Sequence, residues 1–321
     1  SLTKKEIKEE TDLRLCEKFN DESVFDYVFI DEGQDWFKEE AYILGCIFGI
    51  NNLAVAHGVN QEVRGLSFDW KTLTDKDCFN QRILRKGRRM KTNLVSFIQM
   101  FSEDEILNDD YLNLEKVSEA HGGEVFIIVG NYLSEETFEQ FIQERREGSG
   151  SNIDLLHCVP SSDTVKIDSF MSNEELSEKR YSKTARKIEE YGYEVWDATG
   201  EVTRRNRPNS TRVMRVLNYE SSRGLEGWSV LLHCFDKFWE AKMEESSNEY
   251  EKIASQQELF QSAYQTKEEW CKDFSGKWAL IALTRGVDSI VIHIEDKESY
   301  IGRKLNKMYK EGNDFIHWLE N

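Results

Sequence analysis

The chain contains 321 residues, of which 39% are hydrophobic and 32% are charged, which is typical of a folded globular protein with room for two domains. No window approaches the ~18 consecutive apolar residues that a membrane-spanning helix needs, and no signal peptide is evident, so we expect a cytoplasmic protein. The formal net charge of −18 argues against nonspecific nucleic-acid binding over the whole surface, although the stretches 82–91 and 203–215 are locally basic.

Short apolar runs alternate with amphipathic segments along the chain, a pattern typical of a parallel sheet flanked by helices. The runs are continuously hydrophobic, which favours strands buried on both faces. The predicted strands are 27–31, 52–57, 124–130, 153–159, 193–198, 212–218, 229–235 and 288–294. The predicted helices are 36–49, 92–103, 134–147, 173–191 and 244–273.

A polar stretch, 104–122, ends in a pair of glycines and predicts a domain boundary. We expect an incomplete α/β domain over residues 1–105 and a fuller one over 106–321, with a helical insertion at about 237–276. The six cysteines form no C-x-x-C pair, which predicts reduced and mostly buried thiols.

The strongest local signal is V-F-I-D-E-G-Q-D, residues 28–35. The predicted strand delivers Asp31 and Glu32 to its carboxyl end, where ligands bind in open α/β sheets. Phosphoryl transfer needs one acid to hold Mg²⁺ and another group to orient or deprotonate the attacking water. By itself an Asp-Glu pair also fits a solvated acidic turn. With Gln34 and Asp35 at their fixed offsets, however, the segment resembles the D-E-x-Q-D motif II of UvrD/Rep-type superfamily 1 helicases.

The segment 53–65 resembles motif III of the same family. Its Gln61 falls on the Gln that senses the γ-phosphate in the family. Gly58 stands where the family has Asp. Arg64 replaces the usual aromatic residue, which suggests a contact with a phosphate backbone in place of base stacking.

Two further segments match the phosphate-contacting arginines of the family. The segment 83–98 loosely resembles motif IV, with Arg89 on its Arg, although a basic start of an amphipathic helix is the alternative. The segment 278–292 resembles motif VI and matches it at Thr284 and Arg285. The resemblance makes Arg285 the arginine finger, and a planar guanidinium suits the charge of phosphoryl oxygens.

The segment 216–232 resembles motif V, which follows a buried strand. A glycine such as Gly224 suits backbone that approaches a ligand closely or adopts a positive φ. Glu226 stands where the family contacts the nucleotide sugar, and Glu220 replaces the family's His. The DNA-backbone contacts that the resemblance implies here are Ser221, Ser222 and Arg223.

The resemblance covers about residues 24 to 295 and implies two RecA-like parallel-sheet domains, the first incomplete. It implies ATP and Mg²⁺ as cofactors and single-stranded DNA as partner. Asp31 would bind the metal. The residues implied in catalysis are Glu32, Asp31, Arg285, Arg89 and Gln61, and those implied in nucleotide binding are Gln34, Gly224, Glu226 and Thr284.

The sequence contains no G-x-x-x-x-G-K-[ST], the loop that cradles nucleotide phosphates. We therefore expect part of an ATP-dependent DNA helicase or translocase that is inactive alone, with the loop supplied by an upstream segment or a partner chain. A helicase-like scaffold or regulatory module without hydrolysis is the second interpretation. An unrelated α/β binding or nuclease domain with accidental matches is the third.

Overall fold

The chain divides into two compact units, Ser1–Leu84 and Arg85–Asn321. The computed structural model describes residues 25–57, 69–73, 89–103, 115–116, 119–131, 134, 138–139, 151–166, 180–206, 208, 210–254 and 266–320.

The first unit contains a pair of parallel strands, β1 (Val28–Ile30) and β2 (Leu53–Val55), joined by helix α2 (Lys38–Phe48). Parallel strands need such a crossover connection, because the chain must return to the same end of the sheet. The helix ends at Gly49, whose φ of 79° only glycine adopts easily. Short 3₁₀ helices complete the described part: η1 (Gly33–Asp35), η2 (Ile50–Asn52) and η3 (Trp70–Leu73).

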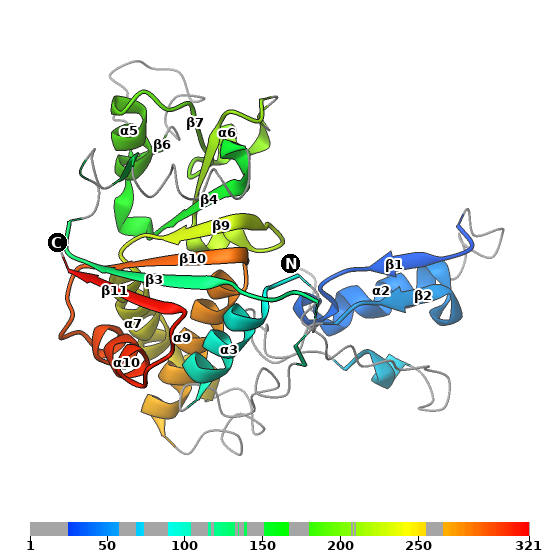
Figure 1. Ribbon diagram of the computed structural model, residues 1–321. Coiled ribbons are helices and arrows are strands. Elements are labelled where there is room, and N and C mark those ends of the chain that lie inside the picture. The colour runs from blue at the N-terminus through cyan, green and yellow to red at the C-terminus, as the bar shows by residue number, and fades with distance from the viewer. Residues whose placement is uncertain are drawn as a thin grey trace. The chain divides into compact units, whose positions relative to one another are not determined.

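The second unit contains a seven-stranded sheet in which every adjacent pair is parallel, in the order β11-β3-β10-β9-β4-β8-β7 (Figure 1). This sheet confirms the predicted α/β class and is consistent with a RecA-like domain. Its strands are β3 (Glu124–Val129), β4 (Leu155–Val159), β7 (Val195–Asp197), β8 (Met214–Asn218), β9 (Gly227–Leu232), β10 (Gly286–Ile294) and β11 (Ile316–Glu320).

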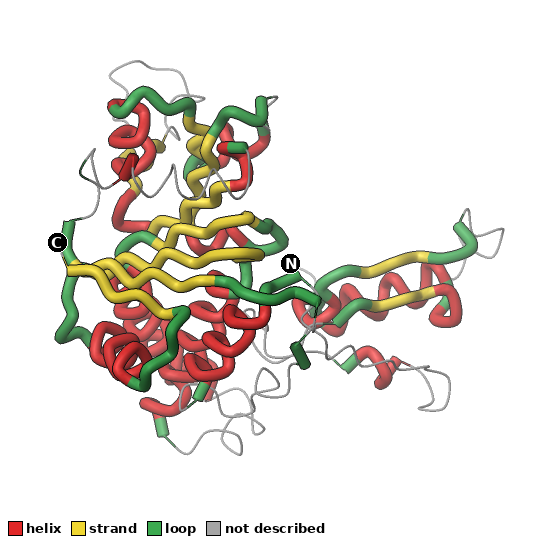
Figure 2. The backbone as a smooth tube through the Cα atoms, in the orientation of Figure 1, coloured by secondary structure: helices red, strands yellow, loops and turns green. Residues whose placement is uncertain are grey.

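Helices cover both faces of this sheet, as Figure 2 shows in red around the yellow strands. Four helices pack on one face: α3 (Thr92–Ser102), α7 (Phe235–Ala254), α9 (Lys267–Leu283) and α10 (Tyr300–Lys310). On the other face lies α5 (Lys183–Glu190). The short helix α6 (Glu201–Arg205) follows β7, and β5 (Thr164–Lys166) pairs antiparallel with β6 (Arg180–Ser182).

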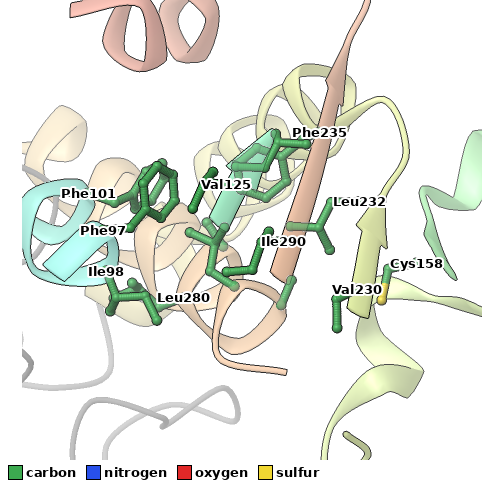
Figure 3. Packing of buried hydrophobic residues seen from close by; sticks show 14 of the residues in the cluster. Phe97, Ile98, Phe101, Val125, Cys158, Val230, Leu232, Phe235, Leu280 and Ile290 are labelled. Atoms are coloured by element: carbon green, nitrogen blue, oxygen red, sulfur yellow. The ribbon is translucent and has the colours of Figure 1, made fainter. Parts of the chain in front are cut away.

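Successive buried side chains along a strand point to opposite faces of the sheet and join different hydrophobic clusters. In β9, Val230 and Leu232 belong to the larger hydrophobic cluster with α3, α7, α9 and α10, whereas Leu231 belongs to the cluster on the α5 face. Figure 3 shows the larger cluster, where Phe97 and Phe101 of α3 pack near Val125. Because side chains on a strand alternate with a period of two, a sheet covered on both faces requires a continuously apolar run.

Helix α3 accounts for the main difference in domain organisation. The expected boundary near residue 105 assigned this helix to the first domain. However, α3 belongs to the unit that begins at Arg85, and its Leu94, Phe97 and Ile98 are fully buried in the core of that unit. The apolar face of α3 packs against the sheet of the second unit, so the contacts divide the chain before the polar stretch.

All eight predicted strands are present, but the helical predictions are only partly covered. The predicted helix 244–273 corresponds to parts of α7 and α9, and residues 255–265 between them lie outside the described residues. Most of the predicted helix 134–147 also lies outside them. Strands β5, β6 and β11 and helices α6 and α10 were not predicted.

No helix in the described ranges is both long enough and apolar enough to cross a membrane. The cysteines that the structure describes carry free thiols: Cys46, Cys158, Cys234 and Cys271. Cys158 and Cys271 are buried, as the sequence predicted for reduced thiols inside apolar runs.

Candidate functional site

The motif II acids form a tight turn directly after β1. Asp31 is exposed, and its carboxylate accepts a hydrogen bond from the backbone N–H of Glu32 at 2.9 Å. Glu32 has a left-handed backbone conformation, with φ 52° and ψ 46°, which is uncommon for a residue with a side chain. Its carboxylate accepts a hydrogen bond of 2.5 Å from the Gln34 side-chain amide, and Gln34 is only 3% exposed. Gln34 therefore orients the carboxylate of Glu32.

Gly33 anchors this turn to the neighbouring strand. Its N–H donates to the Ala56 carbonyl at 2.8 Å, and its own carbonyl accepts from the Trp70 indole at 2.8 Å. A Cβ at this position would lie 2.4 Å from Cγ1 of Val55, closer than a side chain allows. The glycine of D-E-G-Q-D is therefore required by packing, which holds the two acids in one conformation.

The donor chemistry of this turn fits Mg²⁺. Mg²⁺ prefers hard oxygen ligands, and proteins usually bind it through one or two carboxylates, with water and phosphate oxygens completing the shell. Asp31 and Glu32 provide such carboxylates, while in the described ranges no group of three or more metal-binding side chains gathers. Gln61 and Arg64, the site residues predicted in motif III, lie outside the described residues.

In the second unit, the motif V segment runs from the carboxyl end of β8 to the amino end of β9 through the 3₁₀ turn η9 (Tyr219–Ser222). Ser222 is fully buried, and its hydroxyl donates to the Tyr219 carbonyl at 2.7 Å. Gly224 has a φ of 75°, and a positive φ is one of the two reasons expected from the sequence for a glycine at this position. Ser221 and Arg223 are half-buried, so of the three predicted DNA contacts only Ser222 is enclosed by the protein.

Motif VI joins motif V through Arg285. This side chain is 5% exposed, and its Nε donates to the Ile281 carbonyl at 2.8 Å. Nη2 donates to the Thr284 hydroxyl at 3.0 Å, and Nη1 contacts the Leu225 carbonyl at 3.5 Å. In turn the Arg285 carbonyl accepts from the N–H of Gly227 at 3.0 Å, where β9 begins. The guanidinium is thus held against the end of α9 and the motif V loop.

Two further guanidinium groups meet the same loop. Arg89, just before α3, forms an ion pair with the Glu226 carboxylate. Arg215, on β8, donates through Nη2 to the Glu226 carbonyl at 2.6 Å. The residues predicted in motifs IV, V and VI therefore come together at residues 225–226. The structure adds Arg215 to them. Three arginines therefore lie near residues 225–226, and such a local group of positive charges suits phosphate binding.

Arg215 and a second arginine, Arg204, were not predicted as site residues. The pKa of Arg215 is lowered chiefly by burial, and its Nε is buried without a hydrogen-bond partner in the described part of the chain. Arg204 donates through Nη1 to the Ser221 hydroxyl at 2.8 Å. Both lie in the basic stretch 203–215, which was noted in the sequence. The sequence did not indicate that this stretch lies next to the motif V segment.

Glu220, at the position of the family's His, is paired with a buried lysine. Lys242 of α7 is 4% exposed, and its Nζ lies 2.8 Å from the Glu220 carboxylate. The same ammonium lies 2.7 Å from the carboxylate of Glu245 and 4.4 Å from the centroid of the Trp278 ring. The acid that departs from the family pattern is therefore compensated by a cation from α7.

A row of histidines crosses the opposite face of the sheet. His157 Nδ1 lies 3.0 Å from His233 Nε2, a single hydrogen bond between two buried rings. Burial lowers the pKa of His157 from 6.5 to about 3, and Arg215 adds to the effect. Burial also lowers the pKa of His233, helped by His157 and His293. These rings are therefore neutral members of the core, and among the described residues they form no metal cluster.

Comparisons with known proteins give little guidance. No family model matches the chain, and no curated protein matches it. Among solved structures, it is similar to the C-terminal domain of a possible DNA helicase from Lactobacillus plantarum WCFS1, with 11% identity and a TM-score of 0.36. This match covers 71% of the chain and 97% of the other protein. A score this low carries no argument, so any assignment of function depends on the residues of the chain itself.

Proposed function

We propose that this chain is part of an ATP-dependent helicase or translocase that moves along single-stranded DNA. The observation that supports the proposal is the meeting of Arg89, Glu226 and Arg285 at the amino end of β9. These residues come from three separate segments of the chain, and each segment resembles a different motif. Accidental matches would have no reason to converge in space, so the convergence favours a shared role over an unrelated α/β domain.

The first unit would contribute the metal and water chemistry. Mg²⁺, when bound, would neutralise charge on the nucleotide phosphates. Asp31 would hold it, and Glu32, oriented by Gln34, would accept a proton from the attacking water. Gln61 would respond to the γ-phosphate.

The second unit would contribute cations and nucleotide contacts. Arg89 and Arg285 would stabilise charge on phosphoryl oxygens, and Arg285 has to leave the Leu225 carbonyl to do so, because it is only 5% exposed here. Movement of the Arg285 side chain between the Leu225 carbonyl and the phosphoryl oxygens would couple the state of the nucleotide to the motif V loop. The residues proposed for nucleotide binding remain Gln34, Gly224, Glu226 and Thr284.

The DNA contacts would come from the motif V turn and from Arg64. Ser221 and Arg223 are half-buried, and Arg223 offers a permanent charge to a phosphate. Ser222, whose hydroxyl is bonded to the Tyr219 carbonyl, would act through the shape of the turn.

A scaffold without hydrolysis is the second candidate, favoured by the lack of a phosphate-binding loop in the sequence. For the first candidate, an active helicase or translocase, we propose that another segment or a partner chain provides this loop.

ATP hydrolysis, measured with and without single-stranded DNA, separates the two candidates. The 321-residue chain should be inactive by itself, and DNA-stimulated turnover should appear when a polypeptide carrying the loop is present. Absence of turnover in every combination, with DNA binding retained, would establish the scaffold instead. Hydrolysis by the chain alone would contradict the need for an external loop.

A further inference from the structure

The basic helix α6 adjoins the motif V turn, and two acids in this region, Glu201 and Glu220, are each paired with a cation. We infer that the last turn of α6 is a further binding site for the sugar–phosphate backbone of single-stranded nucleic acid, with Arg204 as its main contact. This inference rests on the proposed function, because it extends a strand from the motif V turn onto α6.

The sheet brings α6 and the motif V turn to the same edge. Helix α6 follows the carboxyl end of β7, and η9 follows the carboxyl end of β8. Because β7 and β8 are adjacent and parallel, their carboxyl ends lie side by side (Figure 1). A hydrogen bond of 2.8 Å from Arg204 Nη1 to the Ser221 hydroxyl connects α6 to η9.

A side-chain hydrogen bond links β7 to helix α6 at the residue before Arg204. The Trp196 indole of β7 donates to the Thr203 carbonyl at 3.1 Å, and the N–H of Arg204 donates to the Gly200 carbonyl at 3.0 Å. Arg204 itself is exposed. A guanidinium carries five N–H donors, and in the described part of the chain Arg204 uses one of them, on Ser221. The remaining donors are available to a ligand.

The charge around this edge favours a phosphate despite the acidic chain. Glu201 is paired with Arg205 in an i,i+4 ion pair. Glu220, next to Ser221, would repel a phosphate, but Lys242 binds it at 2.8 Å from a buried position. Among the described residues, Arg204 therefore acts as an uncompensated cation beside a hydroxyl.

An exposed guanidinium next to a serine hydroxyl matches a phosphodiester. Arginine binds phosphate oxygens in a bidentate manner, and serine hydroxyls are common donors to the same groups. Both groups recognise the backbone of the strand and carry no preference for a base. We therefore expect binding to depend on backbone charge and to tolerate different sequences.

Fluorescence anisotropy with a labelled oligothymidine tests this site in the whole chain. Arg204→Gln should weaken binding about tenfold, as loss of a charge-assisted contact predicts. The slope of log K against log salt should fall by about 0.7, the value for one phosphate of a single strand. Arg186→Gln is the control, because Arg186 is an exposed arginine on helix α5 that, unlike Arg204, is ion-paired, with Glu189. The control should bind like the wild type.

Lys242→Met provides an independent test, because it removes the cation that compensates Glu220. Binding should weaken in Lys242→Met and recover in the double variant Lys242→Met/Glu220→Gln, with folding of both checked by thermal unfolding.

The outcomes separate this inference from the proposed function. Wild-type binding that Arg204→Gln leaves unchanged would overturn the α6 site alone, leaving the proposed function intact. Absence of oligothymidine binding by the wild-type chain at low salt would contradict both the α6 site and the proposed function. Equal or tighter binding of duplex DNA would overturn the assignment to single strands.

Discussion

Arg89 and Glu226 lie 137 residues apart in the sequence and form an ion pair at the amino end of β9. Their side chains are 63% and 41% exposed, so solvent screens the pair and its contribution to stability is small, about 0–1 kcal/mol. The pair matters for its position, because it joins the segments that match motifs IV and V. Arg285 reaches the adjacent Leu225 from motif VI.

Arg285→Ala should slow ATP hydrolysis far more than it weakens nucleotide binding. An arginine finger contributes about 10³-fold or more to the rate, because it stabilises charge that develops only in the transition state. The comparison is kcat against nucleotide Kd, measured with the phosphate-binding loop supplied. A loss confined to affinity would contradict the finger role.

The same variant should also lower stability, because Arg285 donates to the Ile281 and Leu225 carbonyls inside the unit. The Ile281 carbonyl would still accept from the Thr284 hydroxyl at 3.0 Å, so the cost is that of the lost hydrogen bonds themselves, about 0.5–1.5 kcal/mol each. Thermal unfolding of Arg285→Ala and of the exposed control Arg186→Ala separates this effect from catalysis.

Glu32→Gln should abolish turnover while leaving ATP binding intact, again with the loop supplied. The amide cannot accept the proton of the attacking water, but its oxygen can still accept the hydrogen bond from Gln34, so the turn should keep its shape. Glu39→Gln on α2, an exposed glutamate, is the control and should hydrolyse ATP normally. Turnover retained in Glu32→Gln would refute the assignment of the base.

Acid should destabilise the second unit through His157. In the folded chain this ring stays neutral down to a pKa of about 3, whereas the unfolded chain takes up the proton near pH 6.5. Unfolding is therefore favoured as the pH falls below 6.5, by about 2 kcal/mol at pH 5. The measurement is urea unfolding at a series of pH values.

His157→Asn should flatten this pH dependence, whatever its effect on stability at neutral pH. His121→Asn changes an exposed histidine and should keep the wild-type slope. Identical slopes for all three proteins would show that the buried ring does not account for acid sensitivity.

Gly302→Ala in α10 should lower stability despite the better helix propensity of alanine. The new Cβ would lie 2.6 Å from the carbonyl oxygens of Asp296 and Lys297, which are backbone atoms and cannot move independently. Overpacking of this kind costs about 1–3 kcal/mol, against a propensity gain of about 1 kcal/mol. Lys307→Ala on the exposed side of the same helix is the control. A variant at position 302 as stable as this control would contradict the packing.

The strands were predictable because a sheet covered on both faces demands unbroken apolar runs, as in β9 and β10. Strand β11 was not predicted because it lies at the sheet edge, where the polar residues His317 and Glu320 interrupt the apolar run. Strands β5 and β6 are only three residues long and carry no such run.

Site residues could be predicted only where they belong to a local sequence motif. Gly224 was expected either to approach a ligand closely or to adopt a positive φ, and it has a positive φ. Arg204, Arg215 and Lys242 reach the motif V segment through tertiary packing from other elements, and no sequence spacing encodes those contacts. The roles of Asp31 and Arg285 in catalysis stay predictions.

The most direct test of the central claim is equilibrium binding of the 321-residue chain to a labelled single-stranded oligonucleotide across about 50 to 200 mM salt. A chain with a net charge of −18 has no general affinity for DNA, so binding would require the local arginine sites. We predict binding at low salt that weakens linearly in log K against log salt and exceeds binding to duplex DNA. Absence of binding at the lowest salt concentration would contradict the account.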